Sequence, residues 1–111
     1  MKIATVERDG VVCLRIEGRL DATSAPGAEA AVKGLLGEGR RNLLFDLSAM
    51  DYISSAGLRV VLMTVKELRS RKGKMVLCAL NPYVKEVFDV SQFSSVVPIT
   101  DSVETGLQLM R

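Results

Sequence analysis

The sequence predicts an α/β fold, with a mixed sheet of four to five strands and about four helices in a single domain over residues 1–111. Two β-type runs flank a turn near the N-terminus, two later runs are apolar throughout, and apolar residues recur at helical spacing between them. The 111 residues are 48% apolar and 25% charged, which suits one compact core and leaves no room for a second.

The first third predicts an antiparallel hairpin followed by a helix. Strand-like residues at 4–7 and 11–17 flank Asp9-Gly10, a dipeptide that readily takes the positive φ angles of a tight hairpin. A helix should follow Leu20 and end at the glycines of 37–39. Its start is marked by residues able to cap a helix and by a proline suited to its first turn: Asp21, Thr23, Ser24 and Pro26.

The middle of the chain predicts the centre of the sheet and the longest helix. Residues 42–47 carry apolar side chains consecutively, so we expect this strand to be covered on both faces and to lie centrally. The clearest amphipathic helix spans 55–71, and its apolar positions repeat at helical spacing: Leu58, Val61, Leu62, Val65 and Leu68. Residues 48–57 should form the loop between the two.

The last third continues the alternation of strand and helix. A second continuous apolar strand at 75–80 precedes Asn81-Pro82, an N-cap and a first-turn proline that begin a short helix. A last strand at 96–99 should lie at an edge because of Pro98, and Asp101 with Glu104 predicts a capping box for a C-terminal helix.

Composition excludes several classes of function. The chain has no His, which removes the usual zinc ligand and the commonest general base, and no cofactor motif is present. Cys13 and Cys78 lie in apolar runs with no partner for a metal site, so we expect buried, reduced thiols.

Charge and hydropathy favour neither nucleic acid nor membrane insertion. The net charge is +2, and the densest basic run is interpreted as a solvated helix end: Arg69, Arg71, Lys72 and Lys74. No apolar run approaches about 18 residues, so the protein is expected to be cytoplasmic. No exposed apolar patch is evident from the pattern, which favours a monomer.

The candidate site is the loop that opens the long helix, because functional loops gather at the carboxyl ends of parallel strands. Ser54 and Ser55 begin this helix, and small Ala56 and Gly57 would let another surface approach the backbone. One interpretation is that either serine is an N-cap. The other is phosphorylation, since a phosphate there is favoured by the helix dipole and would alter binding to a partner.

Three segments together resemble the STAS domains, specifically the stand-alone bacterial anti-sigma factor antagonists. The resemblance covers nearly the whole chain and is carried by FDLS at 45–48 with MDYISSAGL at 50–58, EGRLD at 17–21 and CALNPYVKEVFD at 78–89. The family's usual loop reads Asp-Ser-Ser/Thr-Gly, and its modified serine falls on Ser55. Ser54 replaces the family's acid and Ala56 its second hydroxyl, so Ser54 is the alternative site.

The resemblance implies a partner-switching cycle without an enzyme activity in this chain. The unmodified protein would bind an anti-sigma factor that is also a GHKL-type serine kinase, and so release a sigma factor. Phosphorylation on Ser55 would end this binding, and a PP2C-type phosphatase would restore it.

The same resemblance implies a partner-binding surface around the loop. Asp21 matches a family acid near the phosphosite, with a helix N-cap as the equal alternative, and we place Thr23 beside it. Leu58 and Arg59 continue the surface along the helix, although Leu58 also fits the core. Asp46 matches a family strand end, where a structural role is favoured.

Two other functions stay open at this stage. A stand-alone STAS subunit could regulate a membrane lipid or anion transporter. An enzyme could use Asp46, Asp51 and the serines, but nothing nearby in the sequence supplies a base or a metal cage.

Overall fold

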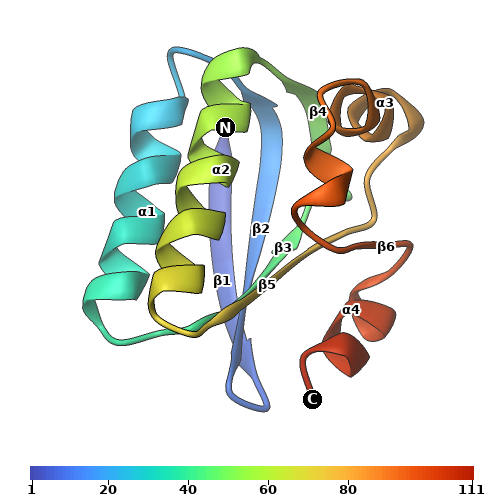
Figure 1. Cartoon of the computed structure of the whole chain (residues 1–111). Helices are drawn as coiled ribbons and strands as arrows, with labels where there is room; N and C mark the ends of the chain where they lie inside the picture. The colour runs from blue at the N-terminus through green and yellow to red at the C-terminus, as the bar shows by residue number, and fades with distance from the viewer.

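The computed structural model describes residues 1–111 and is built on one mixed sheet (Figure 1). Five strands lie in the order β1-β2-β3-β5-β6, and the short β4 pairs with the far end of β2. The strands are β1 (Lys2–Arg8), β2 (Val11–Leu20), β3 (Asn42–Asp46), β4 (Met50–Ile53), β5 (Lys74–Cys78) and β6 (Ile99–Thr100). The helices are α1 (Ala25–Gly37), α2 (Ser55–Ser70), α3 (Pro82–Val90) and α4 (Val103–Leu109). The predicted fold class is confirmed, with one strand more than the expected four to five.

The hairpin and the central strand are confirmed. Strands β1 and β2 are antiparallel, and Asp9 and Gly10 turn the chain with φ angles of 52° and 79°. The pairs β2–β3, β3–β5 and β5–β6 are all parallel, which places β3 in the middle of the order. Leu43, Leu44 and Phe45 are all fully buried, as expected for a strand covered on both faces.

The two faces of the sheet are covered unequally. Helices α1 and α2 lie side by side on one face, over the larger apolar core, and α3 lies beside β4 (Figure 1). The short α4 covers part of the other face, where Met110 packs with Leu44, Val76 and Cys78. Strand β1 is an exposed edge on which only Ile3 is half-buried.

The start of α4 corrects one predicted cap. Asp101 was expected to cap this helix, but the N-cap is Ser102, whose hydroxyl accepts a hydrogen bond from the Thr105 N–H at 3.1 Å. Serine and aspartate are comparably good caps, so the sequence pattern alone does not separate two neighbouring candidates.

The last strand is also shorter and later than predicted. Strand β6 covers Ile99–Thr100, and a 3₁₀ turn at Phe93–Ser95 precedes it. The Pro98 carbonyl accepts a hydrogen bond from the Leu77 N–H at 2.9 Å, but proline has no N–H with which to extend the ladder.

The buried face of α2 is rotated from the predicted stripe. Val61, Val65 and Leu68 are buried as expected, whereas Leu58 and Leu62 are only half-buried. Val60 and Thr64 complete the buried face, and the Thr64 hydroxyl can be buried because it donates to the Val60 carbonyl at 2.8 Å.

Only one of the two thiols is fully buried. Cys78 is buried, and its sulfur accepts a hydrogen bond from the Thr100 hydroxyl at 3.2 Å. Cys13 is half-buried, which corrects the expectation of a core thiol, because it lies on the part of the sheet that α4 leaves open. Burial raises the pKa of both thiols, so both are held in the protonated form.

The packing of α4 against the sheet depends on the absence of a side chain at Gly106. A Cβ atom at Gly106 would lie 2.3 Å from the Cys78 sulfur and 3.0 Å from a Leu44 methyl group. We expect Gly106→Ala to lower the free energy of unfolding by about 1–3 kcal/mol, because α4 must move off the sheet. Gly34→Ala is the matched control: no atom lies within 4 Å there, and alanine in a helix should add about 0.5–1 kcal/mol. Urea denaturation of both variants is the measurement, and a Gly106→Ala protein as stable as the parent would contradict this packing.

Candidate functional site

The loop that carries the serines is shorter than predicted because part of it is a strand. Residues 48–57 were expected to form one loop, but Met50–Ile53 forms β4, which pairs in parallel with the end of β2. Met50 and Ile53 are buried against the core, while Asp51 points to solvent. The pairing brings Leu20 opposite Ile53, so the two following segments leave the sheet at the same end.

Ser54 is the N-cap of α2 and is tied to β2. Its side chain accepts a hydrogen bond from the Gly57 N–H at 3.4 Å, and its own N–H donates to the Leu20 carbonyl at 2.9 Å. Its carbonyl accepts the first helical hydrogen bond, from Leu58, at 2.9 Å. Ser54 is half-buried, so the structural interpretation of this serine is confirmed.

Gly57 allows the first turn of α2 to lie directly on β2. A Cβ atom at this position would be 2.7 Å from the Leu20 carbonyl oxygen and 2.8 Å from the Ile53 side chain. The requirement for glycine is therefore close approach within the chain, since Gly57 is buried and faces inward. The role of Gly57 in binding a partner stays a prediction.

Ser55 is the first residue of α2 and is exposed. Its hydroxyl forms no hydrogen bond within the chain, in contrast to that of Ser54. The free N–H groups of the first helical turn lie next to it, and no acidic side chain occupies that turn. An anion on Ser55 would therefore meet a favourable helix dipole.

Asp21 follows β2 directly and organises the turn before α1. Its carboxylate accepts hydrogen bonds from the Thr23 and Ser24 N–H groups at 3.0 and 3.2 Å. The helix is counted from Ala25, but Ser24 makes no side-chain cap, and the Asp21 carbonyl accepts a hydrogen bond from the Ala25 N–H at 2.8 Å. Asp21 therefore caps the turn that leads into α1, which confirms the capping alternative. The Ser24 backbone N–H is the main cause that lowers the pKa of Asp21, with help from the Thr23 N–H and from Arg19, so the carboxylate stays charged.

Arg19, Tyr52 and Tyr83 form a cluster beside Asp21 that the sequence did not indicate. The Arg19 guanidinium lies 4.2 Å from the centre of the Tyr52 ring and 3.7 Å from the Asp21 carboxylate. The Tyr52 ring stacks on Tyr83 of α3, with ring centres 6.2 Å apart. Arg19 and Tyr52 are neighbours because they are paired across β2 and β4. The cluster was not predicted because β4 was not predicted.

The other predicted residues are divided between surface and core. Thr23 and Arg59 are exposed, and Ala56 and Leu58 are half-buried against the large core. Asp46 is not part of this surface. Its carboxylate accepts a hydrogen bond from the Ser48 N–H at 3.1 Å, and it lines a hollow beside Cys13, which supports the structural role favoured for it.

The chain holds no candidate metal centre and no membrane-spanning helix. No three His, Cys, Asp or Glu side chains lie close enough together to hold a metal ion. No helix is both long and apolar enough to cross a bilayer. The Ser55 hydroxyl is exposed and has no hydrogen-bond partner in the chain.

Comparison with known proteins places this geometry in a family. The STAS domain model matches residues 2–106. The chain belongs to the STAS family, among the anti-sigma factor antagonists. It is 41% identical over 106 residues to the Bordetella bronchiseptica protein BtrV, which is named as an anti-sigma factor antagonist, and the match covers 96% of this chain and 91% of BtrV.

Solved STAS structures share the fold. An anti-sigma factor antagonist from Mycobacterium paratuberculosis superposes with a TM-score of 0.91 at 23% identity, covering 99% of this chain and 93% of that one. The phosphorylated form of the Bacillus protein SpoIIAA gives 0.77 at 19% identity, covering 99% and 100%. In this STAS chain Ser54, which stands where the resemblance to the family predicts an acid, caps the helix, and serine and aspartate are comparably good caps.

The two serines should respond differently to truncation. We expect Ser54→Ala to lower the free energy of unfolding by about 1 kcal/mol, because the Gly57 N–H loses its acceptor. Ser55→Ala should stay within about 0.5 kcal/mol of the parent, because its hydroxyl has no partner in the chain. Chemical denaturation of the two variants side by side tests this, and equal losses would show that Ser55 shares the capping role.

Proposed function

We propose that this chain is an anti-sigma factor antagonist that works by partner switching. Its unmodified form binds an anti-sigma factor of the GHKL serine kinase type and so releases a sigma factor. Phosphorylation on Ser55 ends the binding, and a PP2C-type phosphatase restores it. The observation that carries the proposal is an exposed, unbonded Ser55 hydroxyl at the first residue of a helix that is otherwise fixed to the sheet.

The geometry favours Ser55 over Ser54 as the modified residue. A kinase must reach the hydroxyl oxygen and accept its proton, and only Ser55 is exposed with that oxygen free. Modification of Ser54 would remove a cap and place a phosphate close to the Leu20 carbonyl, which its N–H already contacts. Phosphate on Ser55 would leave the cap intact.

The partner surface is proposed to surround Ser55. Asp21, Thr23 and Arg59 present exposed or half-exposed polar groups near the same end of the sheet. We add Arg19 and the Tyr52 ring, because arginine and tyrosine are enriched where protein partners bind most tightly. Of the two half-buried residues, Leu58 would contribute its exposed edge, and Ala56 is small enough to let a partner approach.

The names of similar proteins support this function over the transporter alternative. BtrV is named as an anti-sigma factor antagonist, and SpoIIAA was solved in phosphorylated and unphosphorylated forms. We infer that the chain acts by binding and not by catalysis, as a monomer in the cytoplasm, where sigma factors act. The kinase would supply the chemistry, since this chain only needs to offer a hydroxyl.

Phosphate mapping tests the site. After incubation with ATP and the GHKL-type serine kinase encoded nearest to it, the protein should gain a single phosphate, located on Ser55 by fragmentation mass spectrometry. The Ser55→Ala protein should gain none, while Ser54→Ala should still be modified. A phosphate on Ser54 in the parent would move the site, and no phosphate from a demonstrably active kinase would refute the switch.

Charge at Ser55 should control affinity for the same kinase. Ser55→Asp and Ser55→Glu should weaken binding about tenfold or more, because a new anion at the interface opposes the partner's contacts. Ser55→Ala should bind like the parent. Ser95→Asp, at another exposed serine, is the charge-matched control and should leave affinity unchanged. Calorimetric titration measures all four, and equal affinities would argue against electrostatic control.

A further inference from the structure

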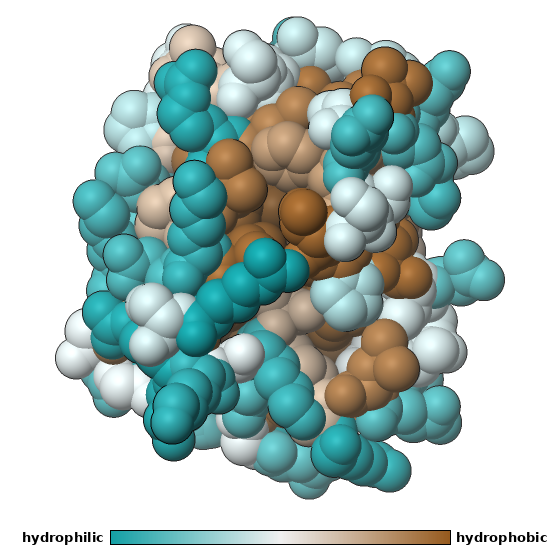
Figure 2. Space-filling view, viewed as in Figure 1, coloured by the Kyte–Doolittle hydropathy of each residue, from teal (hydrophilic) through white to brown (hydrophobic).

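A hollow with apolar walls lies at the open edge of β5, at the other end of α2 from Ser55. Its volume is about 230 Å³, and eight of the twelve residues that line it are hydrophobic. Figure 2 shows these apolar side chains gathered in a depression in the middle of this face, between α2 and the C-terminal segments. Nothing in the proposed partner switch uses this part of the molecule.

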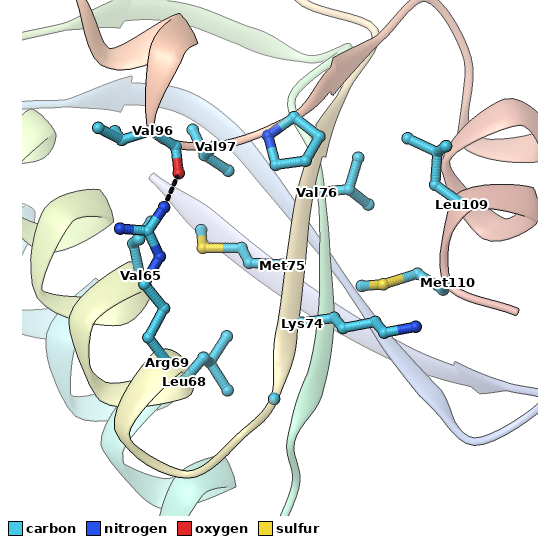
Figure 3. Close-up of a pocket in the computed structure, with 12 residues that line it drawn as sticks. Val65, Leu68, Arg69, Lys74, Met75, Val76, Val96, Val97, Leu109 and Met110 are labelled. Atoms are coloured by element: carbon cyan, nitrogen blue, oxygen red, sulfur yellow. Dashed lines mark hydrogen bonds between the residues drawn. The ribbon is translucent and has the colours of Figure 1, made fainter.

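The hollow exists because β6 covers only half of β5. Strand β6 pairs with Leu77 and Cys78, so the edge of β5 at Met75 has no strand beside it. Pro98 prevents β6 from beginning earlier, since it cannot donate to the ladder. The helices on the two faces then form the walls, with Leu68 on the α2 side and Met110 on the α4 side (Figure 3).

The lining is suited to a flexible aliphatic chain. It contains no aromatic side chain on which a planar ring could stack, and two of its members are methionines, whose unbranched side chains adapt to irregular ligands. The volume is below the about 300 Å³ at which pockets for drug-sized molecules begin. A short single chain therefore fits better than a ring system or a branched lipid.

The rim carries positive charge and no negative charge. Arg69 lies at the α2 side, where its guanidinium donates to the Val96 carbonyl at 2.7 Å, and Lys74 extends toward α4 on the other side of the strand (Figure 3). No Asp or Glu lines the hollow, and neither cation forms an ion pair with a carboxylate of the chain. The remaining guanidinium donors of Arg69 match the two oxygens of a carboxylate.

We propose that this hollow is a binding site for a medium-chain aliphatic carboxylate, that is, a free fatty acid of about eight carbons. The alkyl chain lies along the open edge of β5, among Leu68, Met75 and Met110. The carboxylate lies at the α2 rim, where the free guanidinium donors of Arg69 pair with it, while Lys74 lies across β5 from that position. The proposal is independent of the partner switch, since Ser55 lies at the opposite end of α2.

Methionine methyl groups offer a direct test on the unsubstituted protein. The chain has five methionines, of which Met75 and Met110 line the hollow, while Met50 and Met63 do not and serve as internal controls. With ¹³C-methyl labelling, octanoate should shift the Met75 and Met110 signals to saturation and leave the other two unchanged. Acetate should have no effect, and 1-octanol should bind about tenfold more weakly, because it lacks the charge.

Charge variants separate a built site from general attraction to a basic surface. Arg69→Gln should weaken octanoate binding about tenfold or more. Lys66→Gln removes the same charge from α2 outside the lining and should not change the affinity. Arg69→Lys keeps the charge and should bind octanoate more tightly than Arg69→Gln, which guards against a loss caused by misfolding. No saturable shift at Met75 and Met110, equal affinity for 1-octanol, or equal losses in Arg69→Gln and Lys66→Gln would overturn the proposal.

Discussion

The site depends on one close contact, between the first turn of α2 and the carboxyl end of β2. The Leu20 carbonyl accepts the Ser54 N–H at 2.9 Å, and the absence of a side chain at Gly57 lets the helix lie against the same oxygen. Asp21 and Ser55 each follow directly on these anchored residues. An exposed hydroxyl and an ionised carboxylate are thereby held at one end of the sheet by backbone geometry.

At the other end of the sheet, one strand edge is left without a neighbouring strand. Strand β6 is only two residues long, so the first half of β5 has no strand beside it at this edge, with α2 over one face and α4 over the other. An apolar edge left open in this way is usually an aggregation hazard, and natural proteins protect such edges with charge. Here Arg69 and Lys74 flank that edge, one on each side of β5, and supply the charge.

The elements with strong periodicity could be predicted from the sequence, and those stabilised by distant pairing could not. The continuous apolar run of β3 and the amphipathic pattern of α2 can each be recognised from the local sequence alone. Strand β4 has four residues with only Met50 and Ile53 buried, so its pattern is too short to read, and it exists because β2 lies beside it. The prediction that Ser54 and Ser55 begin the long helix was correct, but which of the two is the N-cap depends on that pairing. The Tyr52–Tyr83 stack joins segments far apart in sequence, so no local sequence pattern predicts it.

The electrostatics of the loop explain why a phosphate at Ser55 would act on a partner more than on the fold. The Asp21 carboxylate accepts backbone hydrogen bonds that lower its pKa, and Arg19 is already engaged by Asp21 and by the Tyr52 ring. A phosphate adds about two negative charges. Within the chain, the helix dipole of α2 offsets part of this charge, because Ser55 lies at the start of the helix. Solvent screens the rest, because Ser55 is exposed. A docked partner excludes that solvent, so the phosphate charges would face the partner with less screening, and the cost in free energy falls on the complex.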